Sequence, residues 1–248
     1  MRFSANTGFL YKELPFIERI RAAAAAGFDA VEFHDEAQTA DPAALADALA
    51  ETGLPVLGLN VRMGETSGCG AVPGAEAQAR ADIDAAAAVA EAVGAGAIHV
   101  LSGKTAGAGA RASLKANLRH ALDRFAGTIL IEPLCAAAVP GYFLDSLELA
   151  LSIRADVDHP RLKILFDCYH VETGEGRCLE RFRAAVAHVG HVQIASVPGR
   201  NEPTGGGLDY ATLLPAIVAG GYGGAFGCEY RPLVAPGETL AALRERVG

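Results

Sequence analysis

The chain has 248 residues and a formal net charge of −8 at pH 7. Because duplex DNA and anionic membrane surfaces attract positively charged proteins, this acidic balance argues against both as partners. A chain of this length can bury roughly 70–75 % of its unfolded surface, so we expect a core that needs no disulfide support. The five cysteines include no CxxC pair, which argues against a disulfide framework or a zinc site and favours the reducing cytoplasm.

Neither a secretory leader nor a membrane span is expected. The N-terminal residues 1–6 lack the apolar stretch of a signal peptide. The longest runs of small apolar residues, 22–26 and 85–90, are far shorter than the ~18 residues that a membrane-spanning helix requires.

Short apolar runs recur along the chain and are typical of buried strands. We expect strands at residues 3–6, 30–33, 56–60, 97–101, 129–132, 163–167, 192–195 and 225–230. Longer stretches between them place apolar residues three and four positions apart, which is the helical period. One such helix is expected to begin with Asp41 as N-cap and Pro42 in the first turn, and to end at Gly53.

Eight strand-and-helix units predict an α/β protein with parallel strands and right-handed crossovers. Eight such units in a chain of about 250 residues are typical of a (β/α)8 TIM barrel. A doubly wound open sheet is the alternative, but no G-x-G-x-x-G fingerprint follows the first strand. No linker or shift in composition divides the chain, so we predict one domain over residues 1–248.

Polar side chains end four successive apolar runs in the second half of the chain: Glu132, Asp167, Gln193 and Glu229. In a parallel barrel they would converge at the C-terminal rim. A single acid at a strand end is usually a helix cap or an ion-pair partner, but three carboxylates and an amide lying together would repel one another without a cation. Ligation by oxygen alone favours Mg²⁺ or Mn²⁺.

The same four residues lie in runs that resemble a known family. These runs are Ile-Glu-Pro (131–133), Phe-Asp-Cys-Tyr-His (166–170), Gly-His-Val-Gln-Ile-Ala (190–195) and Gly-Cys-Glu-Tyr-Arg-Pro (227–232). Together with matches along nearly the whole chain, they resemble the hydroxypyruvate isomerase family, which belongs to the xylose isomerase-like sugar isomerase/epimerase TIM barrels. The resemblance implies a divalent ion held by Glu132, Asp167, Gln193 and Glu229, with the two glutamates as the catalytic acid/base pair.

The implied reaction is an aldose–ketose type isomerisation of a small hydroxy-oxo acid. The metal acts as a Lewis acid on the carbonyl group, and one glutamate removes the neighbouring carbon-bound proton to form an enediolate. Return of a proton to the other carbon converts hydroxypyruvate to tartronate semialdehyde. The sequence leaves open which glutamate begins.

Three further residues are candidates for substrate binding. His170 follows Asp167 by three positions, and the resemblance suggests a contact with the substrate carbonyl or hydroxyl. Arg200 lies in the loop 197–203, where a guanidinium can bind a carboxylate with two hydrogen bonds. Lys104, after the fourth expected strand, is a candidate of the same kind.

The chain departs from the family pattern at Cys135, Ala138 and Gly199, where members commonly carry asparagine, an acid and histidine. These departures leave the substrate open between hydroxypyruvate, another hydroxy-oxo acid and a sugar. A ketose 3-epimerase, a nuclease-like barrel and an inactive barrel stay as alternatives. We expect a small-molecule substrate with no nucleic-acid or membrane partner, and a homo-oligomer is left open.

Overall fold

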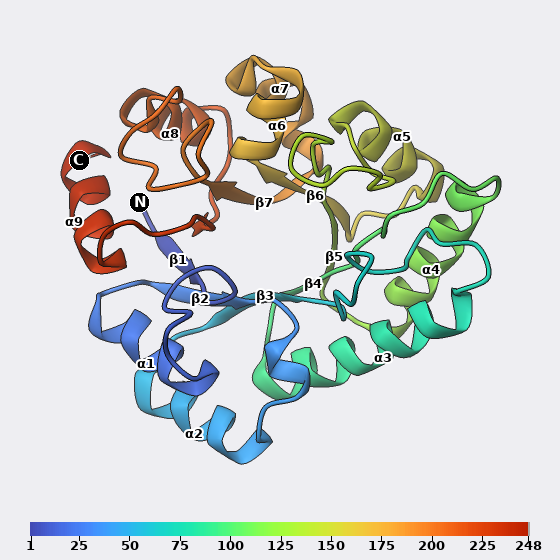
Figure 1. Ribbon diagram of the computed structural model, residues 1–248, viewed down its shortest axis with the longest axis horizontal. Coiled ribbons are helices and arrows are strands. Elements are labelled where there is room, and N and C mark those ends of the chain that lie inside the picture. The colour runs from blue at the N-terminus through green and yellow to red at the C-terminus, as the bar shows by residue number, and fades with distance from the viewer. Residues whose placement is uncertain (248) are drawn as a thin grey trace.

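The computed structural model describes residues 1–247, and Gly248, the last residue of the predicted domain, lies outside the described residues. Eight parallel strands within this range close into a barrel in chain order (Figure 1). The barrel closes where β8 pairs with β1. The strands are β1 (Phe3–Asn6), β2 (Ala30–Phe33), β3 (Val56–Asn60), β4 (Ala97–His99), β5 (Thr128–Ile131), β6 (Leu162–Asp167), β7 (Val189–Ile194) and β8 (Phe226–Cys228).

Helices surround the barrel and cover its outer face (Figure 1). They are α1 (Phe16–Ala25), α2 (Pro42–Thr52), α3 (Glu76–Val93), α4 (Ala110–Arg124), α5 (Leu147–Val157), α6 (Cys168–Glu175), α7 (Cys178–Ala185), α8 (Tyr210–Ala219) and α9 (Pro236–Val247), with short 3-10 turns η1 (Glu36–Gln38) and η2 (Val186–His188). The predicted (β/α)8 TIM barrel is confirmed, and the open-sheet alternative was wrong. All eight expected strands form, with ends within three residues of those predicted.

Helix α2 shows why the local sequence signals work. The side chain of Asp41 accepts hydrogen bonds from the backbone N–H groups of Ala43 and Ala44 at 2.8 and 3.3 Å, and Pro42 occupies the first turn. Gly53 ends the helix at φ 67°, a left-handed conformation that costs glycine little. The predicted start and end of this helix are therefore confirmed.

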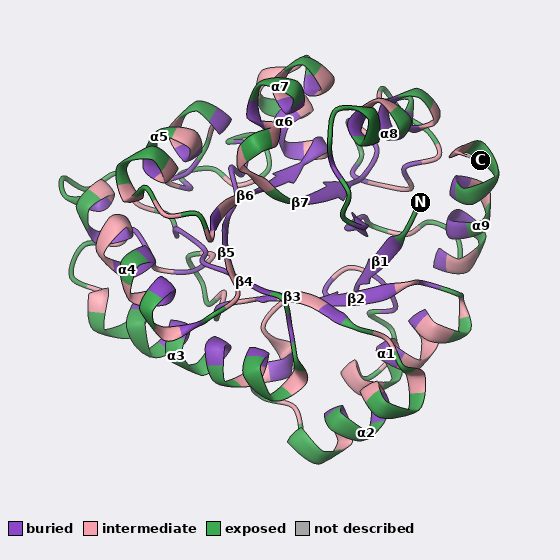
Figure 2. Ribbon diagram, turned by 180° about the vertical axis from the view of Figure 1, so that it is seen from behind, coloured by how far each residue is buried: buried purple, intermediate pink, exposed green. Residues whose placement is uncertain are grey.

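Aromatic side chains join the outer face of the barrel to its helices. Phe33 in β2 contacts Phe16 in α1 edge to face, with ring centroids 5.0 Å apart, and Phe166 in β6 contacts Phe182 in α7 at 5.5 Å. Such pairs contribute about 0.5–1.5 kcal/mol beyond the area they bury. Figure 2 shows that the strands are mostly buried and that the outer sides of the helices are exposed.

Small residues leave space inside the barrel, below the C-terminal ends of its strands. Gly58 and Ala97 line a cavity of about 220 Å³ where barrels of this class usually carry packed layers of bulky side chains. The polar residues His99, His191 and Gln193 also line this cavity. The polar side chains of the C-terminal rim therefore lie above an incompletely filled core.

None of the helices described in residues 1–247 is both long enough and apolar enough to cross a membrane. All five cysteines are free thiols, as the sequence predicted.

Candidate active site

The four predicted oxygen donors lie at one rim of the barrel. Glu132 follows the last residue of β5, Asp167 ends β6, and Gln193 lies beside Asp167 in the β6–β7 register. Glu229 follows β8, whose Gly227 pairs with Gln193. All four side chains are buried. Because parallel strands direct their carboxyl ends to the same face, their places in the chain bring these groups to a common rim.

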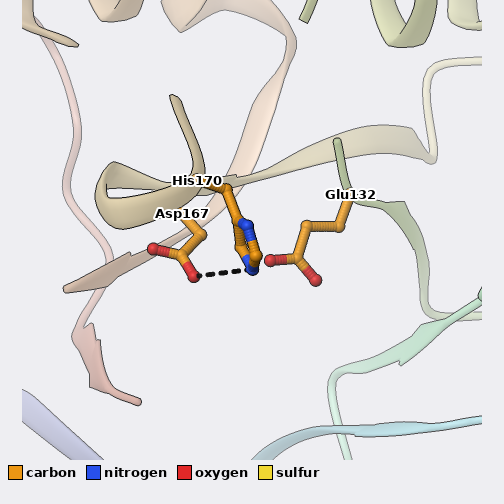
Figure 3. Close-up of side chains that lie close together, drawn as sticks. All are labelled: Glu132, Asp167 and His170. Atoms are coloured by element: carbon orange, nitrogen blue, oxygen red, sulfur yellow. Dashed lines mark ion pairs between the residues drawn. The ribbon is translucent and has the colours of Figure 1, made fainter. Parts of the chain in front are cut away.

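Glu132, Asp167 and His170 converge on one point (Figure 3). One potential ligand atom from each lies within 4.8 Å of the others. Nε2 of His170 lies 3.7 Å from Oδ2 of Asp167, because α6 begins directly after β6 and carries His170 in its first turn. Oδ1 of Asp167 accepts the backbone N–H of Tyr169 at 2.8 Å and caps α6. This cap fixes the carboxylate and leaves its other oxygen for the site.

The guanidinium of Arg200 bridges two of the carboxylates. Its Nη2 donates to Oδ2 of Asp167 at 3.0 Å and to Oε1 of Glu229 at 3.1 Å. Its Cζ lies 4.6 and 5.0 Å from the ring centroids of Phe9 and Tyr169, so two aromatic rings hold the cation. Arg200 therefore supplies the opposite charge that buried carboxylates require.

Glu229 is the strongly acidic member of the group. Burial opposes its ionisation, but the charge of Arg200 and a hydrogen bond with His34 outweigh burial and lower the pKa of Glu229 to about 2. Nε2 of His34 lies 3.5 Å from Oε1 of Glu229. Burial likewise opposes protonation of His34, yet Glu229 raises the pKa of His34. Glu229 is therefore a carboxylate throughout the neutral pH range.

Glu132 has the opposite electrostatic character. Burial, followed by repulsion from Glu229 and Asp167, raises the pKa of Glu132 well above its ordinary value. Burial also raises the pKa of Asp167 to about 6, although Arg200 opposes this shift. Oε2 of Glu132 lies 3.8 Å from Nε2 of His99, while its Oε1 is buried with no hydrogen-bond partner among residues 1–247.

His170 is a neutral ring whose tautomer is fixed by the backbone. The N–H of Cys135 donates to Nδ1 of His170 at 3.2 Å, so the neutral ring carries its proton on Nε2. Burial and the charge of Arg200 lower the pKa of His170 to about 3. Nε2 is buried and has no hydrogen-bond partner in the described part of the chain. It can therefore donate to a substrate oxygen, but in this tautomer it cannot ligate a cation.

The two ends of the Gln193 side-chain amide have different surroundings. Its Nε2 donates to Oε2 of Glu32 at 2.7 Å. Its Oε1 is buried and has no hydrogen-bond partner within residues 1–247. The amide oxygen is thus available as a ligand atom.

In the described residues, no hydrogen bond or ion pair joins the side chain of Lys104 to this group. Its backbone N–H donates to the carbonyl of Thr66 at 2.9 Å and its strand bridge pairs it with Tyr142, while the residue is exposed. Its role in substrate binding stays a prediction.

Sequence reasoning missed His34 and His99. His34 directly follows β2 and His99 ends β4, so both obey the rule that polar residues after apolar runs face the rim. Applying that rule to the first half of the chain would have found His34, which follows the expected strand 30–33, but not His99, because the strand expected over 97–101 ends in the structure at His99.

The oxygen atoms of the site fit a hard divalent cation. Unpartnered buried oxygens on Glu132 and Gln193 need an electropositive partner, whereas Oδ2 of Asp167 and Oε1 of Glu229 accept hydrogen bonds from Arg200. Carboxylate and amide oxygens are the donors that Mg²⁺ and Mn²⁺ prefer. These four residues could therefore hold such an ion.

A cavity of about 640 Å³ opens beside His34 and is also lined by Phe9, Lys12, Met63 and Arg231. His34, which lines this cavity, also contacts Glu229. Lys12, Arg231 and Glu13 give its lining two cationic side chains and one anionic side chain.

Comparisons with known proteins agree with this geometry. The profile of the xylose isomerase-like TIM barrel family matches residues 20–246. The chain is 37% identical over 258 residues to 2-oxo-tetronate isomerase of Cupriavidus necator, covering 100% of this chain and 99% of that protein. It is 35% identical over 255 residues to hydroxypyruvate isomerase of Escherichia coli, covering 98% and 97%.

A solved structure from Brucella melitensis, described as an AP endonuclease of family 2, has a TM-score of 0.93 and 33% sequence identity, with 98% of each chain covered. The family resemblance inferred from the strand-end motifs is confirmed. The chain belongs to the xylose isomerase-like TIM barrel family, in the group that includes hydroxypyruvate isomerase and 2-oxo-tetronate isomerase.

Proposed function

We propose that this protein is a divalent-cation-dependent isomerase of small 3-hydroxy-2-oxo acids, with hydroxypyruvate converted to tartronate semialdehyde as the representative reaction. The observation that carries this proposal is that two buried glutamates, Glu132 and Glu229, lie at the same rim of the barrel as Asp167 and Gln193. Such a pair offers one substrate both a proton acceptor and a proton donor. The names of two relatives denote 2-oxo acids with a hydroxyl on the next carbon, which supports this substrate class.

Glu229 is the group suited to begin the reaction because it is ionised at neutral pH. It takes the proton from C3 of the substrate, and the electron pair of the broken C–H bond forms the enediolate across C2 and C3. A proton then returns to C2 at the same rim, where Glu132 and Glu229 are the two acid/base groups, and exchange with solvent restores the starting protonation state of both glutamates. The hydroxyl proton on the C3 oxygen passes to the C2 oxygen, so the carbonyl group moves to C3 and no redox partner is needed.

The remaining polar groups bind and orient the substrate. Neutral His170 presents an Nε2–H group that can donate to a substrate oxygen. Arg200 carries a buried guanidinium that can bind the carboxylate of the acid. Both side chains already contact Asp167, so a substrate that reaches one of them lies at the acidic group.

Glu132, Asp167, Gln193 and Glu229 would hold the cation through their oxygen atoms. When bound, Mg²⁺ or Mn²⁺ would polarise the substrate carbonyl as a Lewis acid and make the neighbouring C–H more acidic. The unpartnered buried oxygens on Glu132 and Gln193 support this assignment.

The test is a proton-exchange assay in D2O followed by NMR. Chelator-treated protein is supplied with Mn²⁺ or Mg²⁺ and incubated with hydroxypyruvate, with 2-oxo-tetronate and with free ketoses. We expect deuterium at the reacting carbon and migration of the carbonyl group for at least one 2-oxo acid, only when the cation is present. Turnover without any cation would contradict the proposal.

The ketose products of this assay and a separate DNA cleavage assay identify the alternatives. A ketose whose carbonyl stays in place while one carbon changes configuration identifies a 3-epimerase. Cleavage of a duplex that contains an abasic site identifies a nuclease, although the net charge of −8 argues against DNA as a substrate. No turnover on any of these compounds would indicate an inactive barrel.

A further inference from the structure

The amide of Gln193 is held by a carboxylate from the opposite part of the chain. Nε2 of Gln193 donates to Oε2 of Glu32 at 2.7 Å, although the two residues are 161 positions apart. Glu32 lies in β2 and is buried, and Gln193 lies in β7. Closure of the barrel through the β8–β1 pair brings the two strands within reach.

Glu32 is itself fixed by two other side chains. Oγ of Ser4 donates to Oε1 of Glu32 at 2.5 Å, and Nε2 of His191 lies 3.1 and 3.2 Å from its two oxygens. Gly227 leaves the space in which these groups meet, since a Cβ there would lie 2.8 Å from both Cγ of Gln193 and Nε2 of His191. The hydrogen bond between Gln193 and Glu32 is therefore surrounded by closely packed side chains.

We propose that Glu32 is a positioning residue that determines which end of the Gln193 amide faces the cation-binding carboxylates. An amide carries a donor and an acceptor that differ little in shape, whereas a carboxylate only accepts. Glu32 must therefore take the NH2 end, which leaves Oε1 as the free end of Gln193, a residue that pairs with Asp167 in the strand register. An amide rotated by half a turn would present N–H groups to a cation and repel it.

This inference rests on the proposed function, because it assumes that Gln193 is a ligand of the cation. It goes beyond that function by assigning a role to Glu32, which is no ligand itself. Outer groups that orient ligands typically change metal affinity by about 10–100-fold when they are replaced. A purely structural network would instead affect the stability of the fold and leave cation affinity unchanged.

The test is an exchange of the two functional groups, with Mn²⁺ affinity measured by calorimetry on chelator-treated protein. Glu32→Gln removes the carboxylate that selects the NH2 end, and we expect Mn²⁺ affinity to fall at least about tenfold. Gln193→Glu places two carboxylates at hydrogen-bond distance, so that they repel each other or share a proton, and we expect a similar loss. The double variant Glu32→Gln/Gln193→Glu restores one amide donor, one carboxylate acceptor and the total charge. We expect it to recover Mn²⁺ affinity to within about threefold of the wild type, because the arrangement that orients the ligand is restored.

Ser4→Ala is the matched control. It removes one hydrogen bond to Glu32 but keeps the carboxylate, so we expect lower stability in urea with Mn²⁺ affinity close to that of the wild type. Wild-type affinity in Glu32→Gln, or a double variant as weak as the two single variants, would overturn the inference while leaving the proposed function intact. Absence of Mn²⁺ binding in the wild type would overturn both.

A second measurement needs no folded Glu32 variant. The side-chain NH2 of Gln193 can be followed by NMR in the wild type labelled with ¹⁵N-glutamine. We expect its hydrogens to exchange slowly with solvent and to keep their resonances when Mg²⁺ binds, since Glu32 holds them on the side away from the cation. Rapid exchange, or loss of the hydrogen bond on Mg²⁺ binding, would contradict the proposed orientation.

Discussion

Glu132 and Glu229 reach the same rim of the barrel from β5 and β8, yet burial and repulsion raise the pKa of Glu132 while Arg200 and His34 lower the pKa of Glu229 to about 2 despite its burial. The two side chains are chemically identical, so their surroundings alone create the difference. A difference of this kind is typical of groups that divide the donation and acceptance of a proton between them.

Replacing either glutamate is therefore expected to abolish most of the turnover. Glu132→Gln and Glu229→Gln keep the shape of the side chain and remove its ability to exchange a proton. Positioned acid/base groups contribute about 10²–10⁴-fold to the rate, so we expect kcat to fall by that factor. Circular dichroism should show a folded barrel in both variants. Turnover close to that of the wild type in either variant would refute its role.

Asp167 has two separable functions that two substitutions can distinguish. Oδ1 caps α6 by accepting from Tyr169, while Oδ2 faces the site. Asp167→Asn keeps a good N-cap but removes the charge, whereas Asp167→Ala removes both. We expect both variants to lose Mn²⁺ affinity, and the alanine variant to be less stable than the asparagine variant by about 1 kcal/mol. Calorimetry with unchanged Mn²⁺ affinity would contradict a role of Asp167 in cation binding.

The positions of the oxygen donors could be predicted from the sequence because a parallel barrel couples position along a strand to place in space. Glu132 and Asp167 come at the ends of short apolar runs, and strands that run in one direction carry such residues to one rim. The same local reasoning gave the limits of helix α2, whose cap and left-handed glycine are encoded within a few residues.

The orientation of these groups could not be predicted because it depends on contacts between distant parts of the chain. The tautomer of His170 is set by the backbone N–H of Cys135, which lies 35 positions away. The amide of Gln193 is set by Glu32 across the closed barrel. Position on a strand indicates which rim a side chain reaches. Only the folded barrel shows which atom of that side chain already makes a hydrogen bond.

Removing the cation of Arg200 is expected to make stability depend on pH and on added metal. Arg200→Gln leaves Asp167 and Glu229 without their shared partner, and loss of one member of a buried ion pair costs about 3–5 kcal/mol. Without that positive charge, the pKa values of both carboxyl groups rise in the folded state. Raised folded-state pKa values give stability that is present at low pH and lost as pH rises, so the variant should be weakest above neutral pH.

Urea unfolding of chelator-treated protein at pH 5 and pH 8 measures this effect for Arg200→Gln. Arg200→Lys is the control, because it keeps a positive charge at the same position. Saturating Mn²⁺ should restore part of the lost stability in the glutamine variant by binding only to the folded state. Equal destabilisation of the glutamine variant at both pH values would show that Arg200 acts through packing on Phe9 and Tyr169 rather than through charge.

His99 provides a test of burial at the base of the site. Burial lowers the pKa of His99 to about 4, below its ordinary value of 6.5. The unfolded chain therefore binds a proton between these two pH values while the folded protein does not, and stability contributed by neutral His99 is lost as pH falls. One bound proton changes the free energy of unfolding by about 1.4 kcal/mol per pH unit.

The experiment compares the stability of chelator-treated wild type and His99→Gln between pH 6.5 and pH 4. The stability of the wild type should fall more steeply than that of the variant, and the two slopes should differ by about 1.4 kcal/mol per pH unit. NMR titration of the His99 ring gives an independent reading, since its resonance should change little between pH 8 and pH 5 and should titrate mainly below pH 5. Identical slopes in the two proteins, or a ring that titrates near pH 6.5, would show that water reaches His99 and that burial does not lower its pKa.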